Sequence, residues 1–176
     1  MRRIDFFEEQ NKQTANHKEF GLRDDRINQP AYIDVNLSNK EEWLGTVNNY
    51  QSKEVAFHPV DNCVELKRED GSMDSRCEGI LRYDDNNLIF TELKDGKTKN
   101  CKTGWREKAE EQIITTLTYF FDNYQKDMFK IKAWIGNKNV THQNYYQQAL
   151  AFRERTKKIF LLKHGINLSI DSKITI

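Results

Sequence analysis

The stretch that decides the fold is residues 76–94, RCEGILRYDDNNLIFTELK. It contains two runs rich in apolar residues, 76–83 and 88–94, which are separated by the polar residues 84–87. Short runs of β-branched and aromatic residues are typical of strands, and Asp and Asn between two such runs are typical of a turn. We therefore expect two neighbouring antiparallel strands joined by an Asp/Asn turn.

Downstream of this hairpin, the spacing of apolar residues changes from two to three and four, which is typical of helices. The sequence predicts a helix over 105–124, a strand over 129–135, a long helix from Thr141 to Gly165, and a final strand over 166–170. Gly165 follows a basic last turn, as helix ends often do. Helices that alternate with strands in this way predict an α/β fold with a mixed central sheet flanked by helices.

Upstream of the hairpin, the signals for strands and helices are shorter. We expect strands over 54–57 and 63–66, a helix over 38–50, and a helix within 1–25 that docks through Ile4, Phe6 and Phe7. The helix over 38–50 is predicted because Ser38 and Glu41 have the spacing of a capping box. We expect residues 1–37 to be an extension packed on a single domain of residues 38–176.

Composition excludes several classes of protein. The chain has 176 residues, 37% of them hydrophobic, and a net charge of +1, which fits one globular domain rather than a disordered chain. No apolar stretch approaches the length of a membrane span, and the first residues do not resemble a secretory signal, so we expect a cytoplasmic protein with no membrane partner. The three cysteines show no CxxC spacing, which argues against a zinc cage or a disulfide framework.

Charges are sorted along the chain. Residues 61–92 are rich in acids, whereas residues 94–108 and 130–163 are rich in bases. An acidic centre between basic flanks is suited to a cation site that faces a polyanion.

The second strand of the hairpin ends in an acid and a lysine on one face. Side chains alternate along a strand, so Glu92 and Lys94 lie on the same face as Phe90. In an antiparallel pair, the numbers of two directly opposed residues add up to a constant. Glu78 in the partner strand lies on that same face only if this constant is even, for example 170. We therefore expect a three-residue turn with Asn86 left-handed, a five-residue loop, or a bulge.

Two carboxylates at the end of a sheet can hold a hard divalent cation. Glu78 and Glu92 would supply oxygen ligands, the carbonyl of Leu93 another, and Mg²⁺ (or Mn²⁺) is the expected ion. Such an ion polarises a phosphoryl oxygen and lowers the pKa of water, while Lys94 can orient that water. The tripeptide Glu65-Leu66-Lys67 has the same sequence as 92–94, but it belongs to a short expected strand that leads into a charged turn, and we expect it to have a structural role only.

These residues resemble the core of the PD-(D/E)xK nuclease superfamily. The resemblance consists of Glu78 on one strand, Glu92-Leu93-Lys94 on the next, and a following helix that contains Gln112. The expected order of elements is similar to the αβββαβ core of these restriction-endonuclease-like proteins. The superfamily most often has Asp at the first acidic position, where this chain has Glu78.

The resemblance implies a metal-dependent nuclease that cleaves DNA or, less often, RNA. It implies Glu78 and Glu92 as metal ligands, Lys94 as the catalytic lysine and Gln112 as a further residue near the site. Glu41 or Glu42 could match the first-helix acid of some members, and Asp84 or Asp85 could replace Glu78 as the first acid.

Basic residues after the Glu-x-Lys strand are candidates for contacts with nucleic-acid phosphates: Lys97, Lys99, Lys102 and Arg106. The sequence shows no separate module for reading a nucleic-acid sequence, so a protein partner or a homodimer is expected. The rival hypothesis is a catalytically inactive protein that keeps the fold and binds protein or nucleic acid.

Overall fold

The computed structural model describes residues 3–96, 104–140 and 147–176, apart from the side chains of 147–153 and 159. In chain order its strands are β1 (Gln13–Ala15), β2 (Glu19–Arg23), β3 (Tyr32–Asp34), β4 (Gly45–Asn48), β5 (Val55–Pro59), β6 (Gly79–Tyr83), β7 (Asn87–Lys94), β8 (Lys130–Asn137), β9 (Asn167–Asp171) and β10 (Lys173–Thr175). The α-helices are α1 (Trp105–Asn123) and α2 (Gln147–His164), and the short 3-10 helices are η1 (Glu9–Asn11), η2 (Leu37–Glu42) and η4 (Lys126–Met128).

These elements form a mixed α/β fold with two mixed sheets. The larger sheet has six strands in the order β1-β5-β6-β7-β8-β9, in which β1, β5, β6 and β7 are successively antiparallel and β7, β8 and β9 are parallel. Helix α1 makes the crossover from β7 to β8, as a parallel connection requires. The smaller sheet has the order β10-β4-β2-β3, in which β10 and β4 are parallel.

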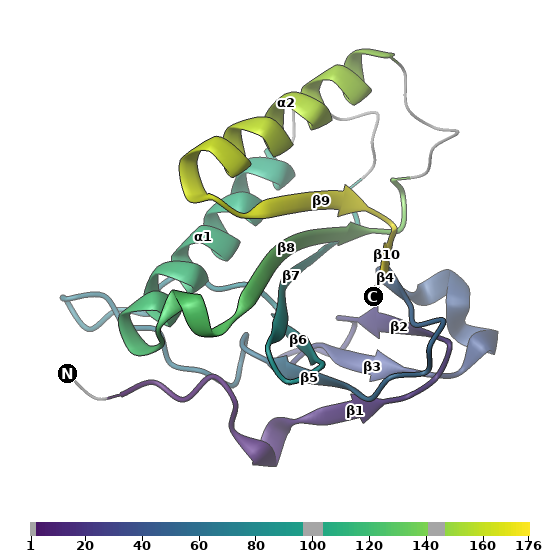
Figure 1. Ribbon diagram of the computed structural model, residues 1–176, viewed down its shortest axis with the longest axis horizontal. Helices are drawn as coiled ribbons and strands as arrows, with labels where there is room; N and C mark the ends of the chain where they lie inside the picture. The colour runs from purple at the N-terminus through teal and green to yellow at the C-terminus, as the bar shows by residue number, and fades with distance from the viewer. Residues whose placement is uncertain (1–2, 97–103, 141–146) are drawn as a thin grey trace.

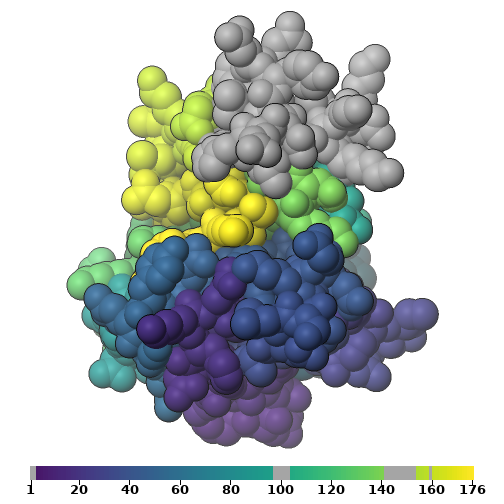
Figure 2. Space-filling model, turned by 90° about the vertical axis from the view of Figure 1, so that its right-hand side faces the viewer, coloured from purple at the N-terminus to yellow at the C-terminus, as the bar shows by residue number. Residues whose placement is uncertain are grey.

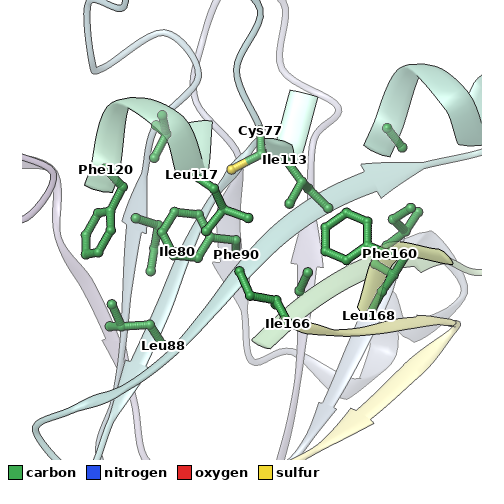
Figure 3. Close-up of a cluster of buried hydrophobic side chains, with 14 of the residues drawn as sticks. Cys77, Ile80, Leu88, Phe90, Ile113, Leu117, Phe120, Phe160, Ile166 and Leu168 are labelled. Carbon is green, nitrogen blue, oxygen red and sulfur yellow. The ribbon is translucent and has the colours of Figure 1, made fainter. Parts of the chain in front are cut away.

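The six-stranded sheet lies between the helices and the smaller sheet (Figure 1). On the helix side, Leu88 and Phe90 of β7 pack with Ile113 and Phe120 of α1 in a buried apolar cluster that also contains Phe160 of α2 (Figure 3). On the opposite side, buried residues of the six-stranded sheet pack against Phe20, Leu22 and Val47 of the smaller sheet. The alternation of side chains along β7 thus separates two cores.

The C-terminal strand links the two sheets. After β9, the chain passes into β10 and pairs with β4, and the backbone N–H of Ile176 donates to the carbonyl of Asn48 at 3.1 Å. Figure 2 shows these last residues, in yellow, above the blue and purple surface of the first third of the chain. The segment 1–37, expected as an extension, supplies β1 to the larger sheet and β2 and β3 to the smaller one.

The hairpin of β6 and β7 has the expected register. Gly79 opposes Thr91 and Tyr83 opposes Asn87, so opposed numbers sum to 170 and the turn has three residues. The left-handed residues of this turn are Asp84 (φ 46°) and Asp85 (φ 58°), not Asn86 as expected. Asp, like Asn, tolerates this conformation, so either residue type can make the turn.

Three predictions upstream of the hairpin are wrong. Residues 38–50 form the short η2, capped by Asn36, and then β4, because the β-branched pair 46–47 pairs with β2 instead of continuing a helix. Residues 3–25 form no α-helix in the described part of the chain, although Phe6 is buried against Phe120 as the docking hypothesis required. Residues 63–66 lie in a loop.

The predictions downstream are confirmed within the described residues. The helix 105–124, the strand 129–135 and the final strand 166–170 correspond to α1, β8 and β9. Gly165 ends α2 with φ 65°, and its N–H donates to the carbonyl of Leu161. Thr141, the expected start of that helix, lies outside the described residues. Neither described helix is long and apolar enough to cross a membrane.

Candidate functional site

The candidate site lies at one end of the six-stranded sheet, where β5 and β7 end and β6 begins. Antiparallel pairing brings these three points together, since Pro59 opposes Gly79 and Gly79 opposes Thr91. Glu78 immediately precedes β6, and its carbonyl accepts the backbone N–H of Val60 at 2.9 Å. The main chain at Glu78 is therefore fixed between two neighbouring strands.

Glu92 is fully buried, and each of its carboxylate oxygens has a donor. Oε2 accepts the backbone N–H of Glu78 at 3.2 Å, and Oε1 accepts the ammonium of Lys94. The last opposed pair of this hairpin is Gly79 and Thr91, so Glu78 and Glu92 are the next residues on the two strands. This anchoring holds the side chain of Glu92 in one orientation.

Glu78 is also buried, with 7% of its surface exposed, but its carboxylate is not satisfied in the same way. Its Oε2 atom is buried and has no hydrogen-bond partner among the described residues. A buried polar atom left without a partner costs about 1–3 kcal/mol. A water, or a cation bound between the carboxylates, could satisfy this oxygen.

Lys94 connects the acid pair, Glu78 and Glu92, to helix α1. Besides Glu92, its ammonium donates to Oε1 of Gln112 at 2.9 Å, and the amide of Gln112 donates to the carbonyl of Arg76 at 3.0 Å. Gln112 thus holds Lys94 from the helix side while it ties down the chain that leads into β6. The structure brings together the four predicted residues Glu78, Glu92, Lys94 and Gln112.

The network closes through a residue that the sequence analysis did not single out. The guanidinium Nε of Arg76 donates to Oδ1 of Asp61 at 2.8 Å, and the backbone N–H of Asp61 points to the carbonyl of Glu78 at 3.4 Å. Asp61 follows β5 by two residues. Asp61 could have been found from the sequence only by knowing that the end of β5 lies beside the start of β6.

Both members of the acid pair have a raised pKa. Burial is the main cause of the raised pKa of Glu78, and the negative charges of Glu92, Asp24 and Asp61 act in the same direction. Burial also raises the pKa of Glu92, although the charge and the hydrogen bond of Lys94 oppose this effect. The raised pKa of Glu78 favours its protonated form, whereas the Lys94 ammonium compensates the charge of Glu92.

The second Glu-Leu-Lys tripeptide has its two charged side chains at the surface and Leu66 in the core. Glu65 and Lys67 form a surface ion pair at 2.8 Å, with side chains 70% and 51% exposed. The side chain of Glu92 is fully buried, so the glutamates of the two tripeptides lie in very different environments, whereas Leu66 and Leu93 are both buried. The burial of Glu92 therefore comes from its position in the sheet.

The described residues form no complete metal cage around the acid pair. Among the described residues, no group of three or more His, Cys, Asp or Glu side chains is arranged to hold a metal ion. Mg²⁺ in proteins commonly uses one or two carboxylates and completes its shell with water and substrate phosphate. Glu78 and Glu92 are the two carboxylates that such a site would use.

Other predicted residues lie elsewhere. The side chain of Leu93 packs in the core between the sheets, so only its carbonyl stays a predicted ligand. Arg106, which was predicted to contact nucleic-acid phosphates, is 4% exposed, and its guanidinium lies 5.1 Å from the centre of the Trp105 ring. Lys97, Lys99 and Lys102 lie outside the described residues.

The alternative acids are explained by other contacts. Asp84 and Asp85 form the turn at the opposite end of β7, and Asp84 pairs with Lys53. Glu42 in η2 pairs with Arg23, and Glu41 is an exposed residue of the same short helix. These residues are therefore not candidates for the site around Glu92.

Comparisons of the chain with protein-family models, with curated proteins and with solved structures found no match. No family or relative therefore assigns a role to any residue of this site.

Proposed function

We propose that this chain is a divalent-metal-dependent nuclease of the PD-(D/E)xK type, which hydrolyses phosphodiester bonds of DNA or RNA. The observation that carries the proposal is the meeting of two buried carboxylates, one with an orphaned oxygen, and one ammonium at the end of a sheet. Buried titratable groups whose pKa is shifted by burial and by a specific charged neighbour are candidates for a functional site.

The roles of the residues follow from their contacts. Glu78 and Glu92 would hold Mg²⁺ or Mn²⁺, which supplies positive charge to the phosphoryl oxygens and lowers the pKa of a nearby water. Lys94 has three N–H donors, of which Glu92 and Gln112 use two, so one remains for a water nucleophile or a phosphate oxygen. Gln112 is a positioning residue, because it acts through the lysine.

The connection of the elements around the site supports the same proposal. Strands β5, β6 and β7 form an antiparallel meander, and α1 then leads to the parallel strand β8. This order matches the βββαβ part of the core to which the sequence is similar. The first helix of that core has no counterpart here beyond η2, so an acid from that helix has no part in the proposal.

A cleavage assay tests the proposal directly. Purified protein is incubated with plasmid DNA, single-stranded DNA and RNA in Mg²⁺, in Mn²⁺ and in EDTA. We expect metal-dependent cleavage of at least one substrate and a loss of at least about 100-fold in Lys94→Ala, which is the range for a group that acts on the nucleophile. Lys67→Ala, in the surface tripeptide, is the matched control and should cleave like the wild type.

No cleavage of any of the three substrates by folded wild-type protein would contradict the proposal and favour a binding protein without catalytic activity. Cleavage that continues in EDTA would contradict the role of the acid pair.

A further inference from the structure

An open hollow of about 450 Å³ lies at the C-terminal end of α1, where the N-terminal segment packs against the helix. Figure 1 shows this segment, in purple, passing below the green end of α1. Asn123, the last residue of α1, lines the hollow and follows Gln112 by eleven residues, so at about 1.5 Å per residue the two lie roughly 16 Å apart. The hollow is therefore separate from the acid pair. Its lining also contains two arginines and three aromatic rings: Arg3, Arg82, Phe7, Tyr124 and Phe129.

The two arginines of the hollow have no carboxylate partner among the described residues. The Nε atom of Arg82 donates to a main-chain carbonyl at 2.9 Å, and Arg3 is exposed. No described residue of the lining is acidic. The charge of Glu9 acts on the surroundings of Arg82, but Glu9 is paired with Lys12 at 2.7 Å. The hollow therefore carries positive charge that an anion can neutralise.

The guanidinium groups lie over aromatic rings of the same lining. That of Arg82 is 5.1 Å from the centre of the Phe7 ring, and that of Arg3 is 5.9 Å from the centre of the Tyr124 ring. The rings of Phe7, Tyr124 and Phe129 are partly buried and pack on one another, with their centres 5.5–6.3 Å apart. Aromatic faces and guanidinium planes are the groups on which unpaired nucleic-acid bases stack.

A free amide adds hydrogen-bonding groups to the lining. Gln125 is exposed, and its side chain has no hydrogen bond with any described residue. The amide of Asn123, in contrast, is used on both sides, by the N–H of Ile4 at 2.9 Å and the carbonyl of Tyr119 at 2.8 Å. An amide that donates and accepts side by side matches the edge of a base. The lining thus offers rings for a base, an amide for its edge and guanidinium groups for a phosphate.

The shape of the hollow favours a strand over a free nucleotide. Sites for small molecules enclose most of the ligand surface, whereas this hollow is open to solvent. A nucleotide bound here can continue into a chain on either side. In a duplex the bases stack on one another, so the rings of the hollow can receive a base only from a single strand.

We propose that this hollow binds one nucleotide of a single-stranded nucleic acid, with its base on the rings of Phe7 and Tyr124 and its phosphates on Arg3 and Arg82. The proposal does not depend on the proposed nuclease function. If the chain does cleave nucleic acid, the hollow is a second contact with the strand, away from the reacting groups.

The test measures binding of a fluorescent ten-nucleotide single strand by anisotropy across a salt series, in EDTA so that no metal-dependent cleavage occurs. We expect Arg3→Ala and Arg82→Gln each to weaken binding at least about fivefold and to reduce the slope of log K against log salt by about 0.7, the value of one phosphate contact on a single strand. Gln at position 82 can still donate to the main-chain carbonyl, and Arg3 is exposed, so both variants should fold. Arg26→Ala is the matched control, because Arg26 is also exposed and lies over a ring, that of Tyr32, but does not line the hollow. It should stay within twofold of wild type.

Three competitors separate recognition of a strand from attraction of any anion. An abasic strand of the same length keeps the phosphates but lacks the bases, and a ten-residue glutamate peptide keeps only negative charge. AMP has one base and one phosphate but no chain. We expect each to compete at least tenfold more weakly than the unlabelled strand, because a bound base contributes to affinity by stacking and a chain by its further phosphates.

Binding that is the same in Arg3→Ala, Arg82→Gln and Arg26→Ala would overturn the proposal, as would a folded wild-type protein that binds no strand. Competition by the abasic strand, the peptide or AMP that equals that of the strand would also overturn it. Cleavage of nucleic acid without any of these binding effects would leave the nuclease function in place. Strand binding that needs Arg3 and Arg82 in a protein that never cleaves would contradict the nuclease function alone.

Discussion

Replacing Glu78 with Gln should stabilise the metal-free protein at alkaline pH. The carboxyl of Glu78 is buried, and its Oε2 has no partner among the described residues, so the charged form is unfavourable in the folded state. Because its pKa is raised, the folded protein keeps this proton to a higher pH than the unfolded chain. The wild type therefore loses stability as the pH rises above about 4.5, the usual value for Glu, and the Gln variant lacks this loss.

The size of the effect follows from linkage. Each unit of raised pKa corresponds to about 1.4 kcal/mol once both states are ionised. The amide of Gln is itself a buried polar group, so we expect a smaller gain of about 1–3 kcal/mol at pH 8. In a chain of this length, 1 kcal/mol moves Tm by roughly 2–4 °C. The gain should disappear at pH 4, where Glu78 is protonated in both states.

Divalent metal should reduce the stability advantage of Glu78→Gln over the wild type. With 10 mM Mg²⁺ and a Kd of about 1 mM, the wild type gains about 1.4 kcal/mol, because the ion binds only the folded protein. Glu78→Gln should gain almost nothing, since it lacks one of the two carboxylates. Melting curves at pH 4 and pH 8, each with Mg²⁺ or EDTA, measure both effects.

Glu65→Gln is the control, because Glu65 belongs to the exposed copy of the tripeptide and should change Tm little under any condition. The reasoning is refuted if Glu78→Gln is less stable than wild type at pH 8 in EDTA, or if Mg²⁺ raises both melting temperatures equally.

Three further predictions concern the surroundings of the site. Gln112→Ala removes one hydrogen bond of Lys94 and should lower kcat of the nuclease reaction about tenfold, with a loss of roughly 1 kcal/mol in urea unfolding; an unchanged kcat would argue against a positioning role. Gly79→Ala places a Cβ 2.5 Å from the ring of Phe57 and 2.8 Å from the carbonyl of His58, and should cost about 1–3 kcal/mol in the same assay; a neutral result would contradict the tight packing of β5 on β6. Burial lowers the pKa of His58 to about 4. Wild-type stability should therefore fall as the pH drops from 6.5 to 4, because the unfolded chain takes up a proton at His58 that the folded protein does not. His58→Phe should lose part of this pH dependence in acid-unfolding curves.

The hairpin of β6 and β7 could be predicted from sequence because its signals are local. Side chains alternate along residues 88–94, and the turn residues 84–86 lie between the two strands. An odd number of turn residues places Glu78 beside Glu92 on the same face, so the acid pair could be predicted by counting residues along the two strands. The left-handed residue was assigned wrongly, since Asp and Asn both tolerate that conformation and all three turn positions carry one of them.

The smaller sheet could not be predicted because its strands are short and its pairings are distant in sequence. Strands β3 and β10 have three residues each, too few to show a period of two. In β4, Gly45 lies so close to Trp134 that a Cβ would be 2.5 Å from the ring, and this contact joins segments that are far apart in the chain. The capping-box pattern at Ser38 instead predicted a helix in the region that contains β4.

The part of the site beyond the hairpin was also inaccessible to the sequence. Arg76 and Asp61 meet only because the loop between β5 and β6 returns to the start of β6. Arg106 was taken for a surface residue because it follows a basic run, but the first turn of α1 directs it onto Trp105. Tertiary packing determines the contact between Arg76 and Asp61 and the position of Arg106. Neither contact produces a periodic pattern in the sequence.

The most direct test of the central claim is a crystal of the protein soaked in Mn²⁺, with anomalous diffraction data collected at the manganese absorption edge. We expect one strong peak about 2.0–2.2 Å from Oε2 of Glu78, with a carboxylate oxygen of Glu92 as a second ligand and water in the remaining positions. No peak at saturating Mn²⁺, or a peak only at surface acids away from β6 and β7, would contradict the claim that the acid pair is a divalent metal site.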